Sequence, residues 1–368
     1  MYIIETIVKA IKMLGSQNYE LDQFHTDLDG LTPLMFAAKH GLVDWLHTHL
    51  DRLNHDIKKK ILTLKNPGGL TALHFAARYG QCGAIELLLA HDAPTTEKTK
   101  FGALPIHIVF SDVIPEPKQL KSTFDLLSTN EETLQQVTDD GQSLAHLAAR
   151  QDFVYGLERL STSNSVLLDK ENNMGISPLI TAILSNKPNA TSYLLNHVNI
   201  NKIDKNGRTP LHNAALSNPE ILNLVLGSVS FALELSDRNG LTPLQQAINN
   251  QLLENINILL EANASVNNES PCRQYPIHTA VLTLNIPIVE AIKTKGGMIN
   301  QENSDGITPL GMLFSNNPSV ENIKFIHMVL HLKKQGAVAD PNSQQIINSL
   351  DLPDQLEFLK KPSSNLSY

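Results

Sequence analysis

A short phrase recurs nine times along the chain, and this repetition restricts the fold more than any other feature of the sequence. Its fullest form is Gly207-Arg-Thr-Pro-Leu-His212. The copies begin at Gly30, Gly69, Gly102, Gly141, Gly175, Gly207, Gly240, Arg273 and Gly306, so that neighbouring copies start 32 to 39 residues apart. A period of this length is typical of repeat proteins, in which each repeat is one small supersecondary unit that packs against its neighbours.

Each part of the phrase has a structural meaning. An Asp or Asn three residues before the glycine favours a turn, and the glycine supplies the positive φ angle that the turn needs. These residues are Asp27, Asn66, Asn172, Asp204, Asp237 and Asn303. The following Thr or Ser suits a helix N-cap, and the Pro suits the first helical turn. A second apolar stretch follows in each repeat, and its spacing fits a helix with one buried face. Each repeat is therefore predicted to form a turn, a helix, a tight link, a second helix and a return loop.

This pattern resembles the ankyrin repeat family, whose repeat has 33 residues and a Thr-Pro-Leu-His core. The resemblance covers residues 27–340 and implies an all-α fold, an ankyrin-repeat solenoid of about nine helix-turn-helix repeats with terminal caps. Two departures from the pattern stand out. The 39-residue spacings place extra chain at Leu50–Lys65, and at Ser111–Pro117 together with the stretch around Thr129–Val137. Arg273 stands where a glycine is expected, which leaves the geometry of that turn open.

The segments outside the repeats are predicted to cap the solenoid. Residues 1–26 read as an amphipathic helix followed by a short second segment, and residues 341–368 as capping helices with a flexible tail. End caps are expected because an outermost repeat has no neighbour to cover its apolar face. The last stretch, Lys360–Tyr368, also resembles the C-terminal secretion signals of effectors that intracellular bacteria inject into host cells.

Composition excludes several classes of protein. The net charge of −8 argues against a nucleic-acid binder, which usually carries a basic face. Two cysteines cannot form a disulfide framework or a Cys-x-x-Cys metal site. No segment approaches the length of a membrane span, and the N-terminus lacks the uninterrupted apolar core of a secretory signal. We therefore expect a cytoplasmic monomer, or a protein secreted into a host cell's cytosol by a route without an N-terminal signal peptide.

The histidines are the residues that most resemble catalytic groups. Five of the 14 close the repeated phrase, namely His74, His107, His146, His212 and His278. A histidine that recurs with the repeat is better explained as a structural hydrogen-bonding residue than as a catalytic one. His327 and His331 have the i, i+4 spacing of a metal-binding pair, but the glutamate of the His-Glu-x-x-His motif is missing. We predict no catalytic residue, no cofactor and no metal.

A partner is expected to be another protein. In the ankyrin family, the turn tips and the end of the first helix of each repeat line a concave binding face. The corresponding residues are Lys39, His40, Arg78, Tyr79, Phe101, Arg150, Met174, Arg208 and Arg238. Among them Arg78, Tyr79, Phe101 and Arg150 are the first candidates, because Arg and Tyr often carry binding energy at interfaces.

The leading hypothesis is a non-enzymatic protein-interaction module, and its specific version is a bacterial effector that binds a host protein. An endogenous scaffold or inhibitor is the general version. Two other hypotheses stay open. An enzyme could have its site on the inserted loops of the first and third repeats, and Lys58–Lys60 could serve as a contact with a membrane surface.

Overall fold

The computed structural model describes residues 30–111, 116–228, 233–315 and 320–360. The predicted N-terminal cap at 1–26 and the tail at 361–368 lie outside these residues. The chain divides into two compact units, Met1–Thr181 and Ala182–Tyr368. Within the described residues both are helical, and the one β-bridge joins Val137 to Ser143. The prediction of an all-α fold is therefore confirmed for the described residues.

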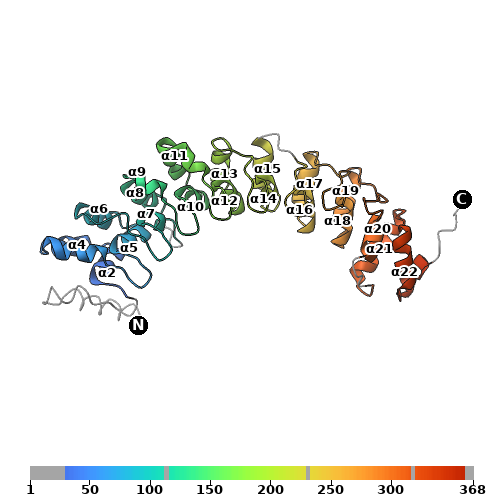
Figure 1. The fold of residues 1–368 in the computed structure, drawn as a ribbon, viewed down its shortest axis with the longest axis horizontal. Helices are drawn as coiled ribbons and strands as arrows, with labels where there is room; N and C mark the ends of the chain where they lie inside the picture. Colours follow the sequence, from blue (N-terminus) through green and yellow to red (C-terminus); the bar gives the residue numbers. More distant parts are fainter. Residues whose placement is uncertain (1–29, 112–115, 229–232, 316–319, 361–368) are drawn as a thin grey trace. The chain divides into compact units, whose positions relative to one another are not determined.

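The first unit contains two layers of helices (Figure 1). In one layer α2 packs on α5, α5 on α7 and α7 on α10; in the other, α3 packs on α6, α6 on α8 and α8 on α11. The bounds are α2 Pro33–Lys39, α3 Val43–Asp51, α4 His55–Thr63, α5 Ala72–Arg78, α6 Cys82–Ala90, α7 Pro105–Ile108, α8 Pro117–Leu127, α9 Glu131–Gln135, α10 Leu144–Arg150, α11 Val154–Ser163 and η2 Ser165–Asp169. The extra chain of the first and third repeats forms α4 and α9.

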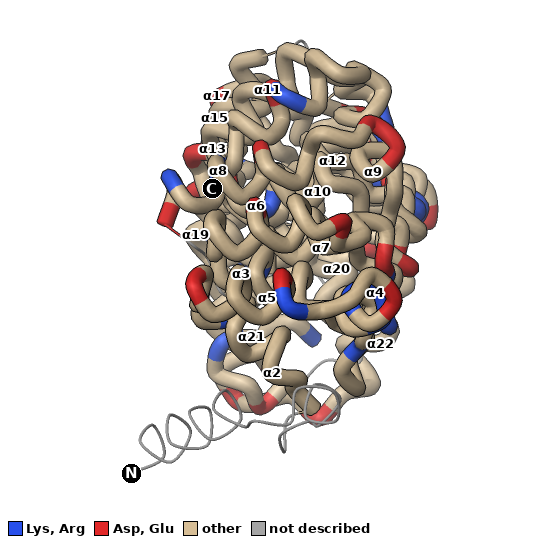
Figure 2. Tube along the Cα trace, turned by 90° about the vertical axis from the view of Figure 1, so that its left-hand side faces the viewer, with Lys and Arg blue, Asp and Glu red and all other residues tan. Residues whose placement is uncertain are grey.

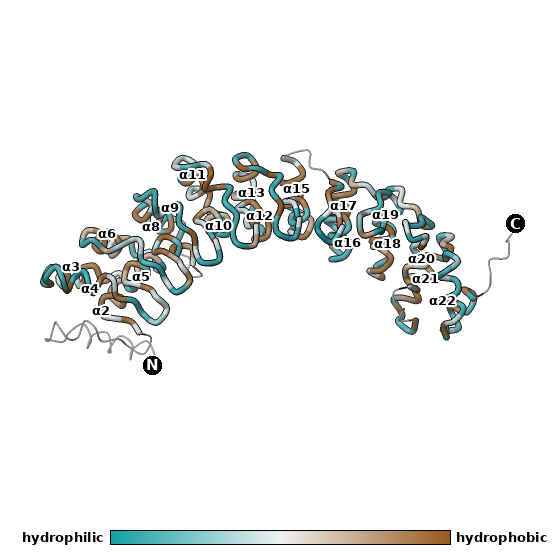
Figure 3. The backbone as a smooth tube through the Cα atoms, in the orientation of Figure 1, coloured by the Kyte–Doolittle hydropathy of each residue, from teal (hydrophilic) through white to brown (hydrophobic). Residues whose placement is uncertain are grey.

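The second unit repeats this arrangement. Helices α14, α16, α18, α20 and α22 form one layer, and α13, α15, α17 and α19 the other. The bounds are α13 Pro188–Leu195, α14 Pro210–Ala214, α15 Pro219–Ser228, α16 Pro243–Asn249, α17 Leu253–Glu261, α18 Pro276–Leu282, α19 Ile286–Thr294, α20 Pro309–Ser315, α21 Ile323–Lys334, α22 Pro341–Ser349 and η3 Asp354–Lys360; α12 spans Pro178–Leu184, across the boundary of the two units. Figure 3 shows hydrophobic stretches recurring on the helices and hydrophilic ones in many of the loops.

The turns that open the second, fifth, sixth, seventh and ninth repeats have the predicted geometry, and Asp27 of the first lies outside the described residues. In the sixth repeat the Asp204 carboxylate accepts hydrogen bonds from the backbone N–H groups of Asn206 and Arg208, at 2.8 and 2.9 Å. Gly207 follows with φ +73°, and Thr209 caps the helix by accepting from the N–H of His212. Asn66, Asn172, Asp237 and Asn303 hold their turns through the same pair of bonds.

The histidine of the phrase connects neighbouring repeats, as predicted. His146 is fully buried; its Nδ1 accepts from the N–H of Ser143 at 3.1 Å, and its Nε2 donates to the carbonyl of Ile176 at 2.8 Å. His74, His107, His212 and His278 make the same bond to the next repeat. Burial lowers the pKa of His74, His107 and His146 to about 4, because a charged imidazole would lose its hydration. In the seventh repeat Gln245 makes both contacts in place of histidine.

The ninth repeat has neither histidine nor glutamine at this position, and a residue from further along the chain replaces the side chain. Gly311 takes the position of the histidine, and the carboxylate of Asp340 fills the space above it. Asp340 Oδ2 accepts from the N–H of Thr308 at 3.2 Å, and Oδ1 caps α22 by accepting from the N–H of Ser343 at 2.9 Å. Burial alone would raise the pKa of Asp340, but hydrogen bonds from Ser343 and Thr308 outweigh it and lower the pKa.

Arg273 adopts the glycine conformation, with φ +56°, so the degenerate eighth copy keeps the turn at a cost in strain. We expect Arg273→Gly to raise the free energy of unfolding by about 0.5–1 kcal/mol, since relief of the strain exceeds the loss of an exposed ion pair with Asp305. Arg273→Ala is the control, because it loses the ion pair and keeps the strain. Urea unfolding measures both; equal stability of the two variants would contradict this account.

Candidate functional site

The helix-end residues predicted to bind a partner lie at equivalent places in the first unit. Lys39, Arg78 and Arg150 are the last residues of α2, α5 and α10, because each first helix ends at the same position of its repeat. His40 and Tyr79 follow as C-cap residues. The Lys39 ammonium lies 5.4 Å from the centre of the Tyr79 ring, so the first two repeats share a contact on this surface.

The two arginines differ in their surroundings. Arg78 is half-buried, and within the described residues its Nε, although shielded, has no hydrogen-bond partner. Arg150 is exposed and donates to the side-chain oxygen of Gln142 at 3.1 Å. A guanidinium with unused donors is suited to a carboxylate. The ring of His40 lies 4.4 Å from that of Phe36, and burial, followed by the charge of Lys39, lowers the pKa of His40. The positive charge at this end of the surface is therefore that of Lys39.

Sequence reasoning missed an apolar floor beside the basic residues. It consists of the residue that directly follows the repeated phrase in each of the first four repeats: Phe36, Phe75, Ile108 and Leu147. Phe36 and Ile108 are half-buried, and Phe75 and Leu147 keep 7% and 9% of their surface exposed. A signal was present in the sequence: the residue directly after the six-residue phrase is apolar in these repeats, but it is polar in three later repeats, at Asn213, Gln246 and Thr279. We call Lys39, His40, Arg78, Tyr79 and Arg150, together with this floor, the inner face.

The turn tips of the first unit carry the two apolar candidates. Phe101 and Met174 are 77% and 62% exposed, as a contact role requires. Successive turns are joined by backbone hydrogen bonds, from the N–H of Asp139 to the carbonyl of Phe101 at 3.0 Å and from the N–H of Asn173 to that of Asp140 at 3.1 Å. The tips are therefore held at a fixed spacing within this unit.

The other two candidates lie in the second unit. Arg238 is exposed at a turn tip, where its N–H donates to the carbonyl of Asn206 at 2.9 Å. Arg208 follows the turn glycine and is half-buried, with Nε 3.8 Å from the fully buried carboxylate of Asp237. Arg208 thus contributes to the packing of its turn. Figure 2 marks the charged positions along the Cα trace, where basic and acidic residues are interspersed.

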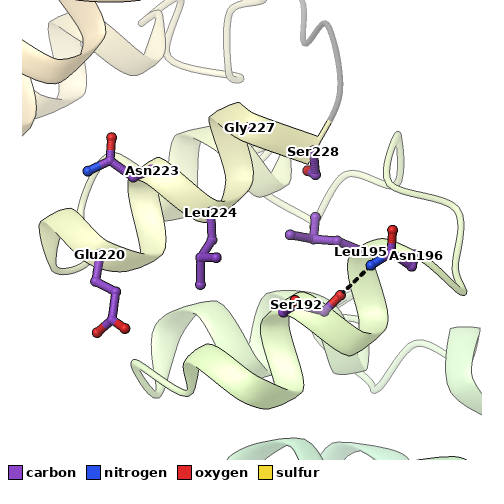
Figure 4. A pocket seen from close by; sticks show the side chains of 8 residues that line it. All are labelled: Ser192, Leu195, Asn196, Glu220, Asn223, Leu224, Gly227 and Ser228. Atoms are coloured by element: carbon purple, nitrogen blue, oxygen red, sulfur yellow. Dashed lines mark hydrogen bonds between the residues drawn. The ribbon is translucent and has the colours of Figure 1, made fainter.

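A hollow of about 580 Å³ opens between α13 and α15 in the second unit (Figure 4). Leu195 and Leu224 supply its apolar lining, and the other residues are Ser192, Asn196, Glu220, Asn223, Gly227 and Ser228. Its lining residues all belong to the second unit, whereas Leu50–Lys65 and Ser111–Pro117, where the enzyme hypothesis expects a pocket, belong to the first. None of the predicted contact residues lines it.

Other chemistry-bearing groups have structural partners. His331 lies 2.7 Å from the carboxylate of Glu290, which joins α21 to α19. Lys58 contacts the ring of His91 at 3.3 Å, so one lysine of the basic run faces a neighbouring helix. In the part of the chain that the structure describes, no three His, Cys, Asp or Glu residues could together hold a metal ion. A helix long and apolar enough to cross a membrane is also absent from those residues.

The stacked helix pairs, the turns and the histidine bonds define an ankyrin-repeat protein, and comparison with known families agrees. The chain belongs to the ankyrin repeat family: the model "Ankyrin repeats (3 copies)" matches residues 4–100, 145–230 and 204–270, more than half of the chain. Ankyrin repeats are protein–protein interaction modules, so the class of function follows from the family.

Similar curated proteins come from animals and bacteria. The chain is 25% identical to the nuclear factor NF-kappa-B p105 subunit of Gallus gallus over 47% of its length. It is 27% identical to the B-cell lymphoma 3 protein homolog of Mus musculus over 47%, and 26% identical to the phosphocholine transferase AnkX of Legionella pneumophila over 46%. These matches span 19%, 41% and 19% of the three relatives, less than half of each.

A solved structure, the ankyrin repeat domain of Bcl-3, is also similar to this chain. It aligns with a TM-score of 0.49 and 24% identity, covering 54% of this chain and 88% of that one.

Proposed function

We propose that this protein is a non-enzymatic module that binds another protein through the inner face and the turn tips of residues 30–181. The observation that carries the proposal is the recurrence of a basic residue at the helix ends, Lys39, Arg78 and Arg150, beside an apolar floor. Arginine and tyrosine near apolar surface are the side chains that most often dominate binding energy.

Charge reversal tests this proposal. We expect Arg78→Glu/Arg150→Glu to weaken binding of the partner by about 10- to 100-fold, which corresponds to a loss of about 0.7–1.4 kcal/mol at each of the two arginines. The partner is first captured from a eukaryotic cell lysate and identified by mass spectrometry. The purified partner is then titrated against the wild-type chain and the variant.

A matched control separates surface from fold. Arg159→Glu makes the same change on an exposed arginine of α11, in the other helix layer, and is expected to bind like the wild type. Circular dichroism verifies that all variants are folded. Because Arg78 is half-buried, its replacement could unfold the double variant. In that case the binding test uses Arg150→Glu alone. Equal binding by wild type, reversed variant and control would reject the inner face as the contact surface.

The specific form of the proposal is a bacterial effector that acts on a protein of a eukaryotic host, and similarity to a Legionella pneumophila protein supports it. Similarity to the chicken and mouse proteins supports the general form, an endogenous scaffold or inhibitor. A translocation reporter fused to the chain distinguishes them. Delivery of the reporter from bacteria into host cells would favour the effector, and retention would favour the scaffold.

A further inference from the structure

The basic residues of the inner face recur with the repeat, and this recurrence restricts the shape of a partner. Lys39, Arg78 and Arg150 belong to the first, second and fourth repeats, and Ser111 takes the equivalent position in the third. Their helices follow one another in a single layer (Figure 1). Packed helices lie about 8–10 Å apart, and we call this distance one step. Lys39 and Arg78 are then about one step apart along the layer, and Arg78 and Arg150 about two.

The size of this step favours a helical partner over an extended one. Seven residues of an α-helix advance by about 10 Å and return to nearly the same face, so a helix can offer one side chain to every repeat. An extended strand covers this distance in about three residues, and residues three apart point to opposite faces. A strand therefore cannot present equivalent side chains to successive repeats.

Two edges of different charge set the orientation of such a helix. The helix-end edge is basic, whereas the turn tips are mixed: Lys100 is exposed beside Phe101, and the carboxylates of Asp139 and Asp140 are exposed on the next turn. The apolar floor runs on the helix-end side of these tips. A helix with an apolar stripe and acidic residues along one flank matches this arrangement, because its acids face the cations of the helix ends and lie away from the carboxylates of Asp139 and Asp140.

We infer that the partner presents an amphipathic α-helix, with apolar residues about seven apart on the floor and acidic residues that meet Lys39, Arg78 and Arg150. Its acids lie about seven and then about fourteen residues apart, because the third repeat has the uncharged Ser111 where the others have a cation. This inference rests on the proposed function and adds the partner's chemistry and periodicity to it.

A displayed library of helical peptides tests the inference with the full chain. Peptides of about 28 residues span the first four repeats, and each position draws from Ala, Leu, Gln, Glu and Lys, which all favour helix. The library is selected in parallel on the wild-type chain, on the Arg78→Glu/Arg150→Glu variant and on Arg159→Glu. We expect enriched peptides to carry Glu at intervals of about seven or fourteen beside a Leu stripe, and to bind the variant at least about tenfold more weakly.

Two results would overturn the inference. One is enrichment of peptides whose Glu residues have no such spacing or are replaced by Lys; the other is equal enrichment on the wild type, the reversed variant and Arg159→Glu. Failure here is distinguishable from failure of the proposed function. A captured natural partner that loses affinity for the reversed variant, although no periodic helix is selected, would keep the binding surface and reject only the helical occupant.

Discussion

Acidification from pH 7.5 to 5 is expected to lower the free energy of unfolding of the first repeats by about 6 kcal/mol, or about 2 kcal/mol for each of three histidines. His74, His107 and His146 have a pKa of about 4 in the folded chain against 6.5 in the unfolded one. The unfolded chain therefore binds more protons between these values. The stabilisation is fully present above pH 6.5 and is lost as the pH falls toward 4.

The single tryptophan makes this loss measurable in the right place. Trp45 lies on α3, so its fluorescence during urea unfolding reports on the unit that holds all three histidines. The control is His74→Gln/His107→Gln/His146→Gln, because glutamine can make both hydrogen bonds of the histidine, as Gln245 does in the seventh repeat. Its stability is expected to change little over the same pH range. If wild type and triple variant keep the same pH dependence, other groups cause it.

Substituting Gly311 with alanine is expected to destabilise the last repeats by about 2 kcal/mol or more, although glycine inside a helix normally costs stability. A Cβ at this position would overlap Oδ2 of Asp340 and lie 3.0 Å from Cβ of Ser343. Asp340 cannot retreat without losing its bonds to Thr308 and to the first turn of α22. Thermal unfolding followed by circular dichroism measures the effect.

Gly227 supplies the comparison for this prediction. It also lies in a helix, α15, but a Cβ there meets no atom within 4 Å. We expect Gly227→Ala to stabilise the chain by up to about 1 kcal/mol, as helix propensity alone predicts. The two alanines should thus shift the midpoint in opposite directions, and a shift in the same direction would show that Asp340 does not occupy the histidine's place.

The sequence predicts the fold well because the constraints of one repeat are local. The residue before each turn, the glycine, the N-cap and the proline act within a few residues of one another, and the structure confirms their roles. The Gly311–Asp340 pair could not be predicted, since it joins the ninth repeat to the N-cap of α22, 29 residues further along the chain. Arg273 was left open for a related reason: nothing in a single sequence says whether an arginine will accept the strain of a glycine position.

The candidate site is less predictable, since contact residues are side chains placed on a shared scaffold. The repeat predicts which residues lie at the helix ends, but it does not predict how exposed their side chains are. Arg208 occupies a position that the family uses for contacts, yet it packs beside the buried Asp237. The apolar floor is hard to predict because an apolar residue such as Phe75 is also what a core position would carry, and only its neighbours in the structure show that it lies at the surface's base.

The backbone bonds between successive turns also decide where this chain tolerates changes in length. Within the first unit the turns are tied from Gly68 to Lys100, from Phe101 to Asp139 and from Asp140 to Asn173, so an added residue there would break the spacing of every tip beyond it. The extra residues of the first and third repeats instead form α4 and α9, after the second helix and before the next turn. A fluorescent tag or a foreign epitope inserted between α3 and α4 should therefore leave the tips undisturbed, whereas the same graft at Phe101 should not.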